Sequence, residues 1–521
     1  MGKTSTARRL LLGVLIAAVA GVMGLVVAVY ALGPRLRAAV HDHTEAYFRD
    51  HFKSTVEIRS FEVSVFPRVH VTLDGLVLRH EGRTDVPPLI QVSRATFDAS
   101  FFSMLRSHPR VHSVQLDGVQ IRIPPHEPGQ HFEFPKTDED LSSKYAVTIG
   151  DVHADDALLV VLPRDTNKRP QPFVMHHLDL RDVSLDRPAE FHAILTNPVP
   201  KGEIDSTGAF GPWNADDPSI TPVNGTYKFE NADLASLKGI RGILSSTGSF
   251  RGPLNYLTVE GETDVPNFGL RTTHHSVPLH TDFAALVDGT NGNVILNSVV
   301  ARFLHTTLDV KGEVVDKTPL KGRTIQLNAV SSRARVEDLL LLAVDSDTSL
   351  MTGAAKLNTE IEIPEGNEDL IEKLHLTGQF AMDDARFTSP TTEQRLETLS
   401  LKGQGKPDEQ PDGDVVSELK GKFAVMKGLV TFQQLSFGVP GAAIDLSGTY
   451  GLDGGDLDFR GHLLLQAKLS QTTTGAKSFF LKAVDPFFRG KNGGTSVPIK
   501  IEGTKDHPVF GLDLRDKMNQ N

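Results

Sequence analysis

Cysteine is absent from all 521 residues of the chain. Disulfide bonds, thiolate metal ligands and cysteine nucleophiles are therefore excluded. The sequence also has no Gly-x-Ser-x-Gly elbow, no Walker-type phosphate loop and no His-Glu-x-x-His pair. These motifs mark many hydrolases, nucleotide-binding proteins and zinc proteases. Nothing in the sequence predicts an enzyme, so we expect no catalytic residues and no cofactor.

Concentrated positive charge is missing as well. The formal net charge is −11, and no run of lysine or arginine interrupts the sequence. Binding to a phosphate backbone needs a basic patch or stripe. We therefore expect no nucleic-acid partner.

Metal-ligand spacings are equally scarce among the 20 histidines. In a strand, the adjacent pairs His176-His177 and His274-His275 direct their side chains to opposite faces. The segment DGTNGN (288–293) is rich in oxygen ligands, but it lacks the further acidic positions of a calcium loop. Turn formation explains its Asp-Gly and Asn-Gly pairs better. No metal site is predicted.

Long apolar runs are rare, and one is long enough to cross a bilayer. Leu10–Leu32 contains no charged residue and, at ~1.5 Å per residue, spans roughly 34 Å as a helix. Basic residues flank it on both sides, so the positive-inside rule favours a cytoplasmic N-terminus only weakly. A cleaved secretory signal is the alternative, although its apolar core is usually about 7–15 residues long. Either interpretation places residues 34–521 across the membrane, on the side away from the cytoplasm.

Beyond this run the apolar pattern changes period. Residues 36–52 carry apolar side chains at helical spacing, which predicts a helix that packs on the first strands or lies at the lipid surface. From Val56 the period is two, as in VEIRSFEVSVFPRVHVTLDGLVL (56–78). The phase slips at Arg59-Ser60, which predicts a bulge, and Pro67 predicts an edge position or the start of a new strand.

Two refrains recur along the strands. VTLDGLVL (71–78) returns as VQLDGVQI (114–121) and more loosely as LDLRDVSL (178–185), and each predicts a hairpin or tight corner. A glycine followed two residues later by phenylalanine or tyrosine occurs six times between 206 and 450, as in LTGQF and LKGKF. Such a glycine permits a bend, and the aromatic covers it from the inner face.

Helical signals are few and short. They occur at 101–108, 233–240, 335–347 and 475–488, whereas 126–144 and 404–414 have the polar, proline-bearing composition of loops. The predicted fold class is therefore mainly β, an extended curved sheet that forms a groove or solenoid, with few short helices and an N-terminal transmembrane helix. The predicted divisions are a cytoplasmic N-terminus (1–9), the anchor (10–32), a juxtamembrane helix (34–54), a continuous β-groove region (55–514) and a tail (515–521).

A sheet with one apolar face has to cover that face. The few helices cannot do so, which leaves a sheet folded over on itself with either an open apolar groove or a fully packed interior. An open groove in a membrane-rooted protein suits lipid acyl chains, because it replaces the bilayer interior as a low-dielectric surrounding. The candidate lining residues are the strand positions Val69, Val71, Leu73, Val114, Leu116, Val119 and Ile121, with the glycine-x-aromatic positions.

The order of these segments resembles the AsmA-like family. The anchor is followed by a short helix, a strand ending in Phe-Pro, a Leu/Met-rich helix at FFSMLRSH and then VQLDGVQI. The ending SFFLKAVDPFFRGKNGGTSVPIKIEGTKDHPVFGLDL (478–514) resembles the family's closing helix, Val-Pro strand and Pro-x-Phe-Gly end. The resemblance implies a single-pass bacterial inner-membrane protein whose bulk lies in the periplasm, related to bridge-like lipid-transfer proteins.

The resemblance implies a function without catalysis. The expected role is to bind or conduct phospholipid acyl chains between the inner and outer membranes in support of outer-membrane assembly. The expected partners are phospholipids, the inner membrane and envelope proteins. The alternative is an anchored periplasmic scaffold that assists outer-membrane proteins by offering strand edges.

Overall fold

The computed structural model describes residues 54–513 with internal gaps. The gaps are 65–67, 81–87, 89, 105–109, 124–147, 162–170, 185–186, 213–219, 238, 290–291, 316–321, 346–347, 367, 369, 411–416, 453, 474–493 and 505–506. The predicted anchor at Leu10–Leu32, the helix predicted at 36–52 and the tail at 515–521 lie outside the described residues. Within the described ranges, no helix has the length and apolarity needed to span a membrane.

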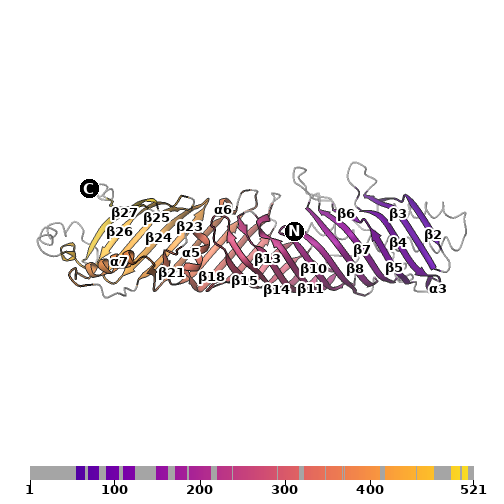
Figure 1. Cartoon of the computed structure of the whole chain (residues 1–521), viewed down its shortest axis with the longest axis horizontal. Coiled ribbons are helices and arrows are strands. Elements are labelled where there is room, and N and C mark those ends of the chain that lie inside the picture. Colours follow the sequence, from indigo (N-terminus) through magenta and orange to yellow (C-terminus); the bar gives the residue numbers. More distant parts are fainter. Residues whose placement is uncertain are drawn as a thin grey trace. The chain divides into compact units, whose positions relative to one another are not determined.

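Most described residues lie in β-strands, which confirms the mainly β prediction (Figure 1). The chain divides into two compact units that interleave in the sequence. Unit 1 comprises Met1–Ser236, Leu244–Thr263 and Ala284–Val294. Unit 2 comprises Leu237–Ile243, Asp264–Phe283 and Ile295–Asn521. This division leaves the predicted continuity of 55–514 as a prediction.

Unit 1 is built from strands that follow one another along the chain and pair with their neighbours. These strands are β1 (Ser54–Glu57), β2 (Ser60–Ser64), β3 (Arg68–His80), β4 (Ile90–Ser100), β5 (Arg110–Asp117), β6 (Gln120–Ile123), β7 (Thr148–Val161), β8 (Gln171–Val183), β9 (Ala189–Pro198), β10 (Lys201–Phe210), β11 (Pro222–Asp233) and most of β13 (Ile243–Pro253). The short helix α3 (Phe101–Met104) follows β4, and the 3₁₀ turn η2 (Leu234–Ser236) follows β11. The pairings are antiparallel from β1 to β11, except that β5 and β6 both run parallel to β7.

Besides β13, three strands contribute residues to both units: β14 (Leu257–Leu270), β15 (Val277–Asp288) and β16 (Asn293–Phe303). The remaining strands belong to unit 2. They are β12 (Ile240–Arg241), β17 (Thr306–Val315), β18 (Thr324–Arg335), β19 (Met351–Thr352), β20 (Ala354–Ile363), β21 (His375–Met382), β22 (Arg386–Phe387), β23 (Glu418–Met426), β24 (Leu429–Val439), β25 (Ala442–Gly451), β26 (Asp456–Leu465), β27 (Thr495–Thr504) and β28 (Pro508–Leu512). From β17 to β28 the long strands pair antiparallel in chain order, and β19 pairs separately with β22.

The helices of unit 2 lie in the connections between strands. They are α5 (Val336–Ala343), α6 (Leu370–Lys373), α7 (Pro390–Gly403) and the 3₁₀ turn η3 (Leu469–Thr472). Because the strands alternate in direction, the connections that hold α5, α7 and η3 all lie at the same ends of the strands, and the connection with α6 lies at the opposite ends (Figure 1). We call the row of strand ends that carries α5, α7 and η3 the helix edge.

The helix predictions are partly confirmed. Residues 335–347 contain α5, 101–108 contain α3, and 233–240 contain only η2, while 475–488 lies outside the described residues. Sequence reasoning missed α7, although its start carries clear signals. Ser389 caps the helix by accepting a hydrogen bond from the Thr392 amide, and Pro390 follows at the first helical position.

The Asp-Gly refrain does not form hairpins, which corrects the prediction. β3 passes straight through Asp74-Gly75, and Gly75 adopts a left-handed φ of 67°. Asp182 within β8 has φ 50°, and Gly118 with φ 61° separates β5 from β6, both of which run parallel to β7. Each positive-φ residue therefore lies inside a continuing strand line rather than at a reversal, and the pairing register is the same on both sides of it. The change of phase predicted at Arg59-Ser60 lies beside Gly75, since the Arg59 amide donates a hydrogen bond to the Asp74 carbonyl oxygen at 3.1 Å.

The core of unit 1 lies on one face of its strands. The core extends from strand to strand through residues that lie opposite one another: Val71 pairs with Phe97, Phe97 with Val114, and Val114 with Val152. All four are at most 6% exposed. Alternating side chains place these residues together and leave His70, Thr72 and their polar neighbours on the opposite face.

Candidate functional site

One face of unit 2 carries apolar side chains in continuous rows that run across the strands, and we call it the apolar face. The central row has one residue from each of eight strands in hydrogen-bonded register. Its members are Leu357, Phe380, Gly421, Leu435, Leu446, Gly461, Ile499 and Leu512. Of these, Gly421 alone is buried, and the leucines, Phe380 and Ile499 stay partly or largely exposed. Aligned apolar side chains that keep some exposure form a surface that another apolar group can cover.

A second row lies next to the central row and is rich in aromatics. It comprises Thr359, Gly378, Phe423, Phe432, Gly448, Phe459, Ile501 and Phe510. The ring centroids of Phe380 and Phe423 are 6.1 Å apart, those of Phe423 and Phe432 6.3 Å, and those of Phe432 and Phe459 5.7 Å. These separations are typical of interacting aromatic pairs. An unbroken line of four rings therefore crosses β21, β23, β24 and β26.

The glycine-x-aromatic refrain is explained by this face. Phe380 pairs with Gly421 and Phe423 with Gly378, so each ring lies opposite the glycine of the neighbouring strand. A Cβ on Gly421 would come within 2.8 Å of the Phe380 ring, and one on Gly378 within 2.9 Å of the Phe423 ring. The glycines make room for the rings, and the rings cover the glycine backbone. In β21 and β23 these aromatics lie on the apolar face, and that this face is the inside of a groove stays a prediction.

The helix edge covers one margin of the apolar face. Here Ala355, Met382 and Leu419 occupy successive strands and are at most 9% exposed. Val336 of α5 and Met351 pack against this cluster, and Leu399 of α7 packs on a neighbouring one at Val439. The apolar face is therefore covered at the helix edge and partly exposed along the central row, and in the second row Thr359 and Phe459 are buried again.

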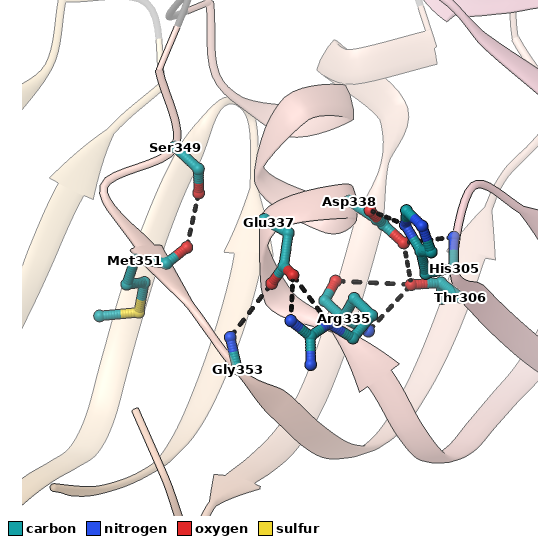
Figure 2. Close-up of polar contacts among 8 residues, drawn as sticks. All are labelled: His305, Thr306, Arg335, Glu337, Asp338, Ser349, Met351 and Gly353. Carbon is teal, nitrogen blue, oxygen red and sulfur yellow. Dashed lines mark hydrogen bonds and ion pairs between the residues drawn. The ribbon is translucent and has the colours of Figure 1, made fainter. Parts of the chain in front are cut away.

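Two acidic residues in the first turn of α5 fix the helix in this position (Figure 2). Glu337 accepts hydrogen bonds from the Gly353 amide at 3.1 Å and from Arg335 Nε at 2.7 Å. Burial by itself would raise the pKa of Glu337, but the hydrogen bonds from backbone amides and from Arg335 outweigh it and lower that pKa. Glu337 thus remains ionised and ties α5 to the start of β20.

Asp338 ties the other side of α5 to the turn between β16 and β17. Its Oδ2 accepts hydrogen bonds from the His305 amide at 2.9 Å and from Thr306 Oγ1 at 2.8 Å (Figure 2). Thr306 Oγ1 in turn accepts from the Arg335 amide at 2.9 Å. Asp338 and Thr306 are 3% and 1% exposed, so water cannot replace these bonds.

This network predicts that Asp338→Ala destabilises unit 2. The substitution leaves the buried Thr306 hydroxyl and the His305 amide without their acceptor, which costs about 2–4 kcal/mol. Asp345→Ala provides the control, because Asp345 pairs with His274 at the end of the same segment but is largely exposed; we expect a loss below about 1 kcal/mol. Urea unfolding of the full chain, followed by circular dichroism, measures both. Equal losses would contradict the role assigned to Asp338.

The lining residues predicted from the sequence lie in unit 1 and share one face. Val69, Val71, Leu73, Val114, Leu116 and Val119 belong to a single cluster and are 0–8% exposed, and Ile121 lies in β6 with its side chain outside the described residues. Their common face agrees with the alternation. Their burial means that other side chains already cover them, so their contact with lipid stays a prediction.

A further surface feature of unit 2 has a mixed chemistry. An open hollow of about 480 Å³ crosses β18, β20, β21, β23 and β24. The exposed lysines Lys356, Lys420 and Lys422 line it together with exposed amide side chains. Leu357, Phe380 and Gly421 of the central row also line this hollow, so it combines polar side chains with part of the apolar face.

Comparison with known proteins adds no relative to this picture. No family model, no curated protein and no solved structure matches the chain.

Proposed function

We propose that the chain is a membrane-anchored, non-enzymatic protein that binds or conducts phospholipid acyl chains along the apolar face of its β-sheet. The observation that carries the proposal is the registered, partly exposed central row of unit 2 with the aromatic row beside it. Apolar area that is left exposed costs free energy in water, at roughly 25 cal/mol per Å². An acyl chain lying across the rows removes that cost and keeps its headgroup in solvent.

The cellular setting follows from the apolar run Leu10–Leu32 and from the resemblance to AsmA-like proteins. In this proposal the run anchors the chain in a bacterial inner membrane, and the β-rich part lies in the periplasm as a groove. The groove passes lipid toward the outer membrane and supports its assembly.

Photocrosslinking of the full chain in its membrane tests the proposal. Benzoylphenylalanine replaces Phe432, a partly exposed member of the aromatic row, or Thr431, the exposed neighbour on the opposite face. Phospholipid adducts, identified by mass spectrometry, are expected at position 432 and not at 431. Adducts at neither position, or equal adducts at both, would refute binding on the apolar face.

A second function has one observation in its favour. In the final described strand, β28, Val509, Phe510 and Leu512 are 60%, 69% and 53% exposed, and among the described strands β28 pairs with β27. An exposed apolar edge strand can accept a further strand from another protein. The same photoreactive residue at Val509 distinguishes the two functions, since an assembly scaffold would crosslink nascent outer-membrane β-proteins there.

A further inference from the structure

Unit 1 carries a cluster of three histidines and three aspartates on the face opposite its apolar core. They come from four adjacent strands, with His153 and Asp155 on β7, His177 and Asp179 on β8, His192 on β9 and Asp205 on β10. Register brings them together, because Asp155 lies opposite His177, His153 opposite Asp179, and Asp179 opposite His192.

Three members present their ligand atoms toward a common point. One atom each from His177, Asp179 and His192 lies within 4.8 Å of the others. His177 Nε2 is 2.9 Å from Asp179 Oδ2. Two ligands bound to zinc at about 2.0–2.1 Å in tetrahedral geometry lie roughly 3.3 Å apart, so a small movement would admit an ion between them. The rings of His177 and His192 meet edge-on, with centroids 5.9 Å apart.

The surrounding carboxylates have the arrangement that metal-bound histidines use. His177 Nδ1 is 2.8 Å from Asp155 Oδ1, which leaves Nε2 facing Asp179. His192 Nε2 is 2.9 Å from Asp205 Oδ1, which leaves Nδ1 for an ion. His153 Nδ1 lies 2.5 Å from Asp179 Oδ1 and holds the third ligand. In metal sites the far nitrogen of a ligating histidine usually bonds a carboxylate in this way.

We propose that His177, Asp179 and His192 form a binding site for a divalent transition-metal ion, with Asp155, Asp205 and His153 as positioning residues. Two imidazoles and one carboxylate suit zinc and its neighbours in the first transition row, and they do not suit calcium or magnesium. The three side chains are 21–39% exposed, so an ion can enter from solvent and water can fill its remaining position. This site is independent of the proposed lipid binding.

Zinc titration of the full chain in detergent tests the site. Isothermal calorimetry should give one zinc ion per chain, and Co²⁺ in its place should show the visible absorption of a tetrahedral complex with nitrogen and oxygen ligands. His192→Ala should weaken binding at least 100-fold. Asp205→Asn, which removes a positioning carboxylate, should weaken it about 10–100-fold. Zinc should raise the melting temperature of the wild type and leave that of His192→Ala unchanged.

The control is His70→Ala, because His70 pairs with Asp98 at 2.7 Å and with the Thr72 hydroxyl at 3.4 Å, on strands of the same unit that lie outside the cluster. Its zinc affinity should equal that of the wild type. Absence of zinc binding in the folded wild type, or equal loss in His70→Ala and His192→Ala, would overturn the site. A retained circular dichroism spectrum in every variant keeps these outcomes apart from unfolding.

Discussion

We expect phospholipid to co-purify with the wild-type protein and most of it to be lost in Leu446→Glu. Leu446 lies in the middle of the central row, where it pairs with Leu435 on one side and Gly461 on the other. A carboxylate there would face the acyl chains, and placing a charge in hydrocarbon costs about 3 kcal/mol or more. That corresponds to a loss of lipid occupancy on the order of 100-fold. Phospholipid per mole of purified full-length protein, by mass spectrometry, is the measurement.

Ser447→Glu is the matched control for this experiment. Ser447 is the next residue in β25, so its exposed side chain projects from the opposite face. It adds the same charge at nearly the same height of the sheet and should leave lipid unchanged. Because Leu446 is only partly buried, we expect both variants to remain folded, with melting temperatures within a few degrees. Equal lipid content in the two folded variants would count against the apolar face as the binding surface.

Gly461→Ala should strongly destabilise unit 2, even though it adds one methyl group. A Cβ at Gly461 would lie 1.8 Å from the Asp445 carbonyl oxygen of the paired strand. Since that oxygen belongs to the backbone, β25 and β26 would have to separate, which we expect to cost about 3 kcal/mol. For a unit of this size the melting temperature should fall by roughly 5–10 °C. Differential scanning calorimetry of the full chain checks the shift.

Gly438→Ala, in neighbouring β24, isolates the steric cause. The nearest atom to a Cβ at Gly438 is Glu418 Cβ at 3.9 Å, an ordinary contact. This variant should match the wild type or gain slightly, since alanine restricts the unfolded chain more than glycine does. A similar fall in both variants would show that loss of glycine flexibility matters more than the contact with Asp445.

Period-two alternation was the part of the fold that sequence could predict. The candidate residues Val69, Val71 and Leu73 do share a buried face, because side-chain direction in a strand depends only on the parity of the position. The Asp-Gly refrain misled because a left-handed residue can occur in a hairpin turn and also inside a strand that continues in unchanged register. Gly75 has the conformation that a hairpin would use, yet β3 continues past it.

The glycine-x-aromatic positions pointed to part of the apolar face of unit 2, whereas the histidine cluster of unit 1 could not be located from the sequence. His177 and His192 become neighbours only through the pairing of β8 with β9, in which a bulge between Met175 and His177 shifts the register. A one-residue change in that register would send the side chains to opposite faces. The start of α7 could have been predicted from the sequence, since Ser389 and Pro390 form a common N-terminal capping pattern.

The return of α5, α7 and η3 to a single edge has a consequence for how such a chain can change in length. An inserted pair of antiparallel strands leaves every later connection on its original edge and every later side chain on its original face. A single inserted strand would move all later helical connections to the other edge. Growth of this architecture in evolution or by design should therefore proceed by whole hairpins, and the length of its apolar face should rise in steps of two strand spacings, roughly 10 Å each.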